Sequence, residues 1–149
     1  MIYYIVYLEN MKNIDEQLKI IRHGASEIIQ EDDLIEKLKS KKKEDLYFLD
    51  IGCGSGIVAH YWGINGSLNT YKKFANVSGI EIDDASRKIL LSNNISAYKS
   101  IEELPNNNFD IIRLNWSLEH TFSPSKYFSF IKKRLNDDGI AIIGVPNYD

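Results

Sequence analysis

The chain has 149 residues, 44% of them hydrophobic and 26% charged, which is the composition of an ordinary globular domain. Its formal net charge of −3 argues against nucleic-acid binding, because surfaces that follow phosphate backbones are strongly basic. The single cysteine, Cys53, excludes an internal disulfide and a cysteine-based metal cluster, and it fits a reducing cytoplasm. The apolar run at residues 1–8 is too short to span a bilayer, so we expect no membrane contact.

Residues 1–44 are predicted to be an N-terminal helical segment, joined to a core at residues 45–149 within a single domain. Apolar residues recur at helical spacing between residues 14 and 43, with Gly24 as the break between two helices.

From residue 46 onward, short apolar runs alternate with helical stretches. The predicted strands are residues 46–51, 77–82, 95–98, 109–114 and 140–145, and the predicted helices are residues 84–92 and 125–135. Continuous apolar strands alternating with helices indicate βαβ units and a parallel sheet buried on both faces. The sequence therefore predicts an α/β fold, a three-layer αβα sandwich with a mainly parallel sheet of about five strands. Ligands of such sheets bind beyond the carboxyl ends of the strands.

A glycine-rich turn, residues 52–56, follows the first of these strands. Glycines allow positive φ and let the backbone approach a ligand closely. The spacing is not that of the dinucleotide fingerprint, because the third glycine comes one residue early, and the Gly-Lys-Ser/Thr of a phosphate-binding loop is absent. Asp50 stands two residues before the turn, where it would repel a pyrophosphate and attract a cationic ligand.

The segment at residues 49–56 resembles motif I of class I S-adenosylmethionine-dependent methyltransferases. In that family the glycine loop wraps the methionine part of S-adenosylmethionine, and the acid lies near its amino group. The resemblance therefore implies a Rossmann-like fold, S-adenosylmethionine as the cofactor, and binding contacts from Asp50, Gly52, Cys53 and Gly54.

Glu81 ends the second predicted strand, where an acid commonly accepts hydrogen bonds from ribose hydroxyls. The surrounding Gly-Ile-Glu-Ile-Asp-Asp also resembles the methyltransferases, which implies the same role for Glu81 and a cofactor contact from Ile82. Asp83 and Asp84 are interpreted as caps of the next helix.

Residues 100–105 follow the third strand. In the resembled family the residues at this place flank the adenine, with an apolar side chain against its face. This resemblance implies cofactor contacts from Ile101 and from Ser100 beside it.

The segment at residues 115–120 resembles the Leu-Glu-His segment of a broad group of small-molecule methyltransferases. It implies cofactor contacts from Asn115 and Trp116, and it makes His120 the candidate acid or base, since a histidine titrates near neutral pH. The alternative role of His120 is to anchor its loop. Some ubiquinone-pathway O-methyltransferases have a metal-binding acid at the place of Trp116, so we expect no metal here.

The resemblance covers residues 46 to 149, with its segments in the family's order, and it implies methyl transfer to a small-molecule acceptor. A non-catalytic S-adenosylmethionine-binding module, or a fragment of a larger enzyme, remains open, and a nicotinamide dehydrogenase is a weaker alternative. The last two strands of the full fold would be missing, so we expect one exposed sheet edge, through which a homodimer could form.

Overall fold

The computed structural model of the chain describes residues 3–9, 39, 41–56 and 68–146. The strands are β1 (Tyr3–Glu9), β2 (Tyr47–Ile51), β3 (Asn76–Ile80), β4 (Ser96–Tyr98), β5 (Phe109–Asn115) and β6 (Leu135–Pro146). The helices are α3 (Leu68–Tyr71), α4 (Asp84–Ser92) and α5 (Pro124–Arg134), and the 3-10 turns are η3 (Lys43–Asp45), η4 (Ile101–Glu103) and η5 (Leu118–His120). Of the helical stretch predicted at residues 14–43, all but residues 39 and 41–43 lies outside the described residues, as does the stretch directly after Gly56.

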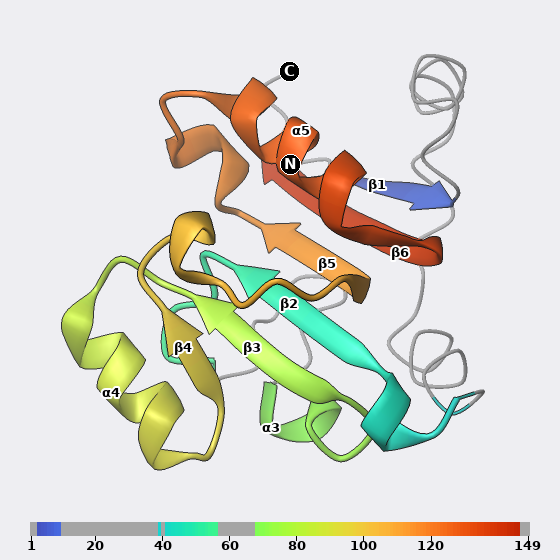
Figure 1. The fold of residues 1–149 in the computed structure, drawn as a ribbon. Coiled ribbons are helices and arrows are strands. Elements are labelled where there is room, and N and C mark those ends of the chain that lie inside the picture. Colours follow the sequence, from blue (N-terminus) through green and yellow to red (C-terminus); the bar gives the residue numbers. More distant parts are fainter. Residues whose placement is uncertain (1–2, 10–38, 40, 57–67, 147–149) are drawn as a thin grey trace.

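The sheet has the order β1-β6-β5-β2-β3-β4, and the strands from β2 to β6 are parallel to one another. This confirms the predicted α/β fold with five parallel strands. The chain leaves β2 toward β3 on one side and later returns to β5 on the other (Figure 1). The carboxyl ends of β2 and β5 therefore flank the switch point of the sheet, where ligands of open α/β sheets bind.

A sixth strand corrects the prediction for the N-terminus. Residues 3–9, part of the predicted helical segment, form β1 and pair antiparallel with β6 from Tyr3↔Pro146 to Glu9↔Ile140. β1 therefore covers the edge of β6 that the sequence predicts to be exposed, and the homodimer stays a prediction. Tyrosine, isoleucine and valine in this run favour a strand, but a short apolar run alone does not distinguish a strand from a helix, and here the pairing with a distant strand decides.

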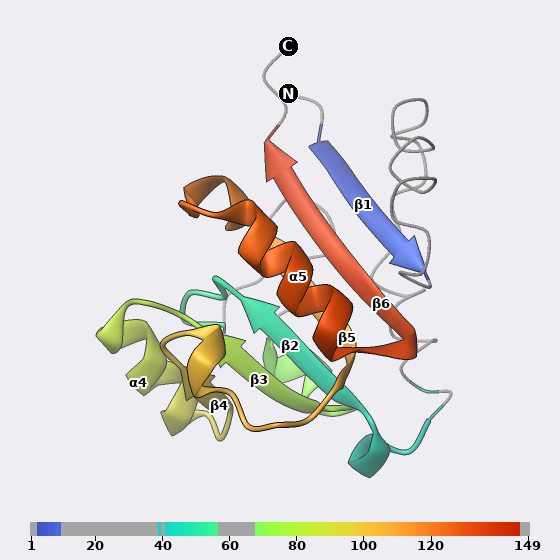
Figure 2. The ribbon, with the colours of Figure 1, turned by 45° about the horizontal axis from the view of Figure 1, so that its top comes forward.

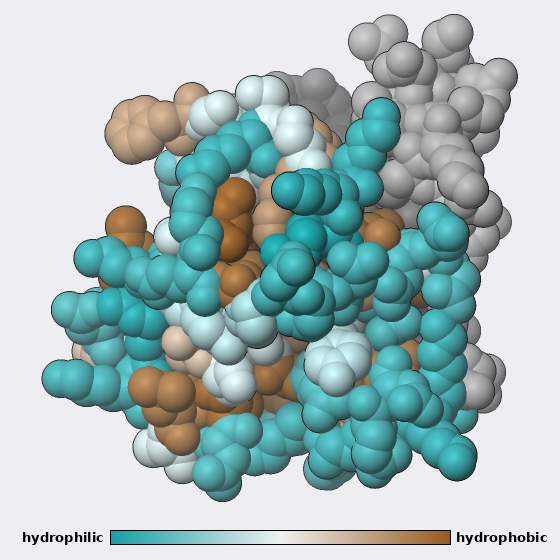
Figure 3. All heavy atoms as spheres, viewed as in Figure 1, coloured by the Kyte–Doolittle hydropathy of each residue, from teal (hydrophilic) through white to brown (hydrophobic). Residues whose placement is uncertain are grey.

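Both faces of the sheet carry a hydrophobic core. Figure 2 shows α5 lying across one face of the sheet, where its Ile131 packs with Leu49 and Ile112. Leu68 and Tyr71 of α3 cover the other face together with Leu90 of α4. The face drawn in Figure 3 is largely hydrophilic, with hydrophobic residues visible between the polar ones and at its left side.

The helices begin and end close to the predicted positions. α4 spans the predicted residues 84–92, and the carboxylate of Asp83 caps it by accepting a 2.7 Å hydrogen bond from the Ser86 amide. α5 ends at Arg134, and β6 begins at once with Leu135, which pairs with Phe109. The last strand is therefore longer at its start than the predicted residues 140–145.

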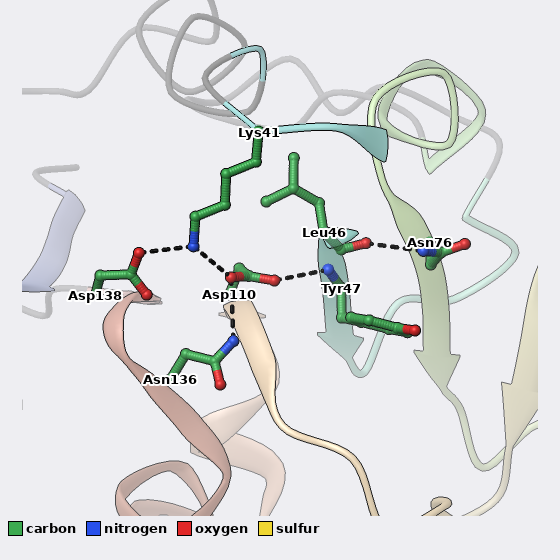
Figure 4. Close-up of polar contacts among 7 residues, drawn as sticks. All are labelled: Lys41, Leu46, Tyr47, Asn76, Asp110, Asn136 and Asp138. Carbon is green, nitrogen blue, oxygen red and sulfur yellow. Dashed lines mark hydrogen bonds and ion pairs between the residues drawn. The ribbon is translucent and has the colours of Figure 1, made fainter. Parts of the chain in front are cut away.

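A polar cluster fastens the amino ends of β2, β5 and β6, opposite the carboxyl edge (Figure 4). The buried carboxylate of Asp110 accepts hydrogen bonds from the Lys41 ammonium at 3.0 Å, the Tyr47 amide at 2.9 Å and the Asn136 side chain at 3.1 Å. Lys41 also pairs with Asp138 at 2.6 Å. These two carboxylates, Asp138 first, raise the pKa of Lys41. Lys41 therefore stays protonated, and its ion pairs hold the chain just before β2 in place.

Candidate functional site at the carboxyl edge of the sheet

The glycine turn after β2, which we call the glycine bend (residues 52–56), has the conformation that the sequence indicated. Gly52, Gly54 and Gly56 have φ values of 74°, 55° and 66°, the left-handed region that side chains rarely adopt. A Cβ on Gly52 would lie 2.3 Å from the Cβ of Ser117, whereas a Cβ on Gly54 would meet no atom of the described residues within 4 Å. Among the described residues, the bend is therefore packed against the β5 end at Gly52 and uncovered at Gly54.

Glu81 joins the bend to the end of β3. One carboxylate oxygen accepts a 2.8 Å hydrogen bond from the Gly54 amide, and the other accepts a 2.9 Å hydrogen bond from the Asp83 amide. A carboxylate offers about four acceptor positions, so two remain for hydroxyl groups of a ligand. Glu81 is half-buried, directly beside the open side of the bend.

Asp50, which is predicted to contact the cofactor, is buried and paired with Arg113. Its two oxygens accept hydrogen bonds from Nε and Nη2 of Arg113, at 3.0 and 2.7 Å. Both residues are buried, and the guanidinium carbon lies 5.4 and 5.3 Å from the ring centres of Phe48 and Tyr71. Burial acts to lower the pKa of Arg113, but the charge of Asp50 and its hydrogen bonds outweigh this and raise it.

Cys53 packs between the bend and β3. Its half-buried side chain lies over Gly79, where an added Cβ would be 2.6 Å from the sulfur. Burial, together with the nearby charges of Asp50 and Glu81, raises the pKa of this thiol, which keeps it protonated and unreactive. Cys53 therefore shapes the bend and offers no thiolate.

The end of β5 is fastened to its neighbours on both sides. The Ser117 hydroxyl donates a 2.8 Å hydrogen bond to the carbonyl of Ile51, and the Trp116 amide donates one of 2.9 Å to the carbonyl of Gly144. Trp116 has a φ of 57°, which costs a bulky residue about 1–2 kcal/mol. Asn115 lies over Gly144, where an added Cβ would be 2.2 Å from its side-chain oxygen. Asn115 and Trp116, both predicted site residues, therefore lie at the carboxyl edge, and their contacts to Gly144 fix their conformation.

The remaining predicted site residues surround this edge. Ile82 is 77% exposed just after Glu81. Ser100 and Ile101 are half-buried at η4, beyond the end of β4, whose Tyr98 carbonyl accepts a hydrogen bond from the Glu81 amide. The side chain of His120 in η5 is 79% exposed, and its Nε2 lies 4.0 Å from a carboxylate oxygen of Glu119.

Two residues of this arrangement were not among the predicted ones, Arg113 and Ser117. Arg113 had a signal, because a charged residue inside an apolar strand needs an opposite charge, and Asp50 is its register partner on β2. Ser117 had none, since its role depends on how closely β5 approaches the bend. Across the described ranges, no group of three or more His, Cys, Asp or Glu side chains could hold a metal ion. Within the same ranges, no helix has both the length and the apolar character that crossing a bilayer requires.

Comparison with known proteins matches residues 14–149 to a family model described as a methyltransferase domain. The chain is 32% identical over 120 residues to a ubiquinone biosynthesis O-methyltransferase of Rickettsia bellii, covering 76% of this chain and 48% of that protein. It is 30% identical over 119 residues to the mitochondrial ubiquinone biosynthesis O-methyltransferase of Saccharomyces cerevisiae, covering 72% of this chain and 36% of that protein.

The fold is also that of a solved S-adenosylmethionine-dependent methyltransferase from Clostridium acetobutylicum. The two share a TM-score of 0.55 and 22% identity, over 76% of this chain and 48% of that one. The chain thus spans about half the length, or less, of the curated relatives it matches.

Proposed function

The chain belongs to the methyltransferase domain family, and on this premise we propose that it binds S-adenosylmethionine at the carboxyl edge of the sheet and transfers its methyl group to a small-molecule acceptor. The observation that carries the proposal is the junction of Glu81 with the open side of the glycine bend. There, a carboxylate with two free acceptor positions lies beside a stretch of backbone that no side chain of the described residues covers at Gly54.

Different residues of the site are placed to bind different parts of the donor. Glu81 is placed to accept hydrogen bonds from the two vicinal hydroxyls of a ribose, as an acid at the end of the second parallel strand commonly does. The bend at Gly54 gives room for the methionine part. The exposed Ile82 and the half-buried Ile101 offer apolar surface for the adenine.

The donor supplies an electrophilic methyl group on a sulfonium. The protein then has to align a nucleophile with that carbon and exclude water, and proximity and orientation account for much of such a rate increase. The fixed end of β5 suits this task, because Asn115 and Trp116 cannot shift without breaking contacts to β6. We retain His120 as the candidate base, since its exposed imidazole is free to reach an acceptor.

We propose a hydroxyl oxygen of a small molecule as the acceptor, and the support for this is that the two curated relatives are both named O-methyltransferases. Trp116 stands where some enzymes of that pathway have a metal-binding acid, so we propose transfer without a metal.

Isothermal titration with S-adenosylhomocysteine, the demethylated product of the donor, tests the binding half of the proposal. We expect binding by the wild-type chain and a loss of at least tenfold in affinity for Glu81→Gln, because an amide offers only one oxygen and faces backbone amides with its own N–H groups. The matched control is Glu44→Gln, which changes an exposed carboxylate at the opposite edge. No heat from the wild-type chain would contradict the proposal. Binding without turnover on any hydroxylated acceptor would favour a non-catalytic module.

A further inference from the structure

We infer that Arg113 is a positioning residue that holds the carboxylate of Asp50 inside the sheet, beneath the glycine bend. It follows that Glu81, and not Asp50, is the carboxylate that faces the bound donor. The inference rests on the proposed binding of S-adenosylmethionine at this edge.

The contacts of Asp50 leave it no route to a ligand. Asp50 and Arg113 are register partners on adjacent strands, so the guanidinium meets the carboxylate side by side and engages both oxygens. The exposed fractions are 4% for Asp50 and 5% for Arg113. The stacked rings of Phe48 and Tyr71 lie against the guanidinium, which further fixes its plane. The carboxylate therefore points along the sheet, away from the open side of Gly54.

The charges around Asp50 and Glu81 support the same assignment as their positions. Asp50 and Arg113 form a neutral pair, and the field of such a pair falls off faster with distance than that of a single charge. The two groups that donate to the carboxylate of Glu81 are neutral backbone amides. The nearby guanidinium of Arg87 donates to the backbone carbonyl of Glu81 and pairs with the carboxylate of Asp84. A cationic donor is therefore attracted chiefly by Glu81.

Removal of Arg113 would leave the buried carboxylate of Asp50 without its cationic partner. An unpaired carboxylate at Asp50 must either take up a proton or turn toward water, and turning would displace the bend that begins two residues later. Among the described residues, the ionisable groups near Asp50 cannot replace Arg113, because neither the Cys53 thiol nor the Tyr71 hydroxyl is a cation and Glu81 is itself an acid. Donor affinity should then depend on the protonation of Asp50, a dependence that the wild-type pair suppresses.

The test is titration of the full chain with S-adenosylhomocysteine at pH 7.5 and 5.5. We expect Arg113→Met to bind at least tenfold more weakly than wild type at pH 7.5, with a smaller ratio at pH 5.5, where Asp50 can be protonated. We expect the double variant Asp50→Asn/Arg113→Met to recover affinity to within about threefold of wild type, because it removes the unpaired charge. Lys41→Met is the matched control, since it removes a cation from a buried carboxylate at the other end of β5 and should lower the melting temperature with unchanged affinity.

A double variant that binds no better than Arg113→Met would overturn the inference, because it would mean that the donor uses the charge of Asp50. Unchanged affinity in Arg113→Met would overturn it as well. Should Arg113→Met fail to fold, the double variant and Glu81→Gln decide between the two acids, and the inference requires the double variant to bind the more tightly by at least tenfold. Absence of binding by the wild-type chain would instead reject the proposed function, so the two failures can be told apart.

Discussion

Alanine substitutions at two glycines of the same bend should have different effects, chiefly on ligand affinity at Gly54 and chiefly on stability at Gly52. Gly54→Ala adds a Cβ that meets no atom of the described residues within 4 Å, so the cost in stability that we expect is the backbone strain of a left-handed residue, about 1–2 kcal/mol. For a chain of this length that lowers the melting temperature by roughly 3–6 °C. The added methyl stands on the open side of the bend, however, and we expect it to weaken S-adenosylhomocysteine at least tenfold.

Gly52→Ala carries the same strain and also places its Cβ 2.3 Å from the Cβ of Ser117, far inside the ordinary contact distance of about 3.5–4.0 Å. Relief requires β2 and β5 to separate at their carboxyl ends, with loss of the hydrogen bond from Ser117 to Ile51. We expect a loss of more than about 3 kcal/mol in the free energy of unfolding. Thermal melts and titration calorimetry on both variants check this. Wild-type affinity in Gly54→Ala, or equal stability of the two variants, would refute the reasoning.

Two further predictions concern residues outside the site. Asp110→Ala should lower the free energy of unfolding by about 3 kcal/mol and the melting temperature by about 10 °C, because a lysine ammonium, a backbone amide and an asparagine lose their shared acceptor. Substitution of the exposed Asp137 by alanine serves as the control. Equal melting temperatures of the two variants would contradict the role of the cluster. The hydrogen bond from Lys126, followed by that from Ser100, lowers the pKa of Glu102 to about 2. Since the folded pKa is depressed, this contact stabilises the fold above the ordinary glutamate pKa, and the stabilisation disappears as the pH falls through about 2. A carbon-detected NMR titration should show that midpoint, and Lys126→Met should raise it toward the usual value near 4.5; an unmoved midpoint would show that Lys126 is not its cause.

The parallel core could be predicted because each of its strands is buried on both faces. Such strands are continuous apolar runs, and the glycines and the capping Asp83 mark where they stop and where α4 begins. The family motifs then placed the glycine bend and Glu81 at neighbouring strand ends, and the structure joins them by a hydrogen bond.

The features that sequence reasoning missed depend on contacts between distant residues. The N-terminal strand β1 is defined only by its pairing with β6, more than 130 residues away. The buried ion pair of Asp50 and Arg113 likewise depends on the strand register, which sets Arg113 beside Asp50. Local pattern indicates which residues are charged, and only the register shows which of them neutralise one another.

The measurement that bears most directly on this account is a ¹H–¹⁵N correlation spectrum of the chain during titration with S-adenosylhomocysteine. The amides of Gly54 and Asp83, which donate to Glu81, should show the largest shifts, while those of Tyr47 and Asn136 at the amino edge should hardly move. Shifts concentrated at the amino edge, or an unchanged Gly54 amide at saturating ligand, would contradict the placement of the donor beside Glu81.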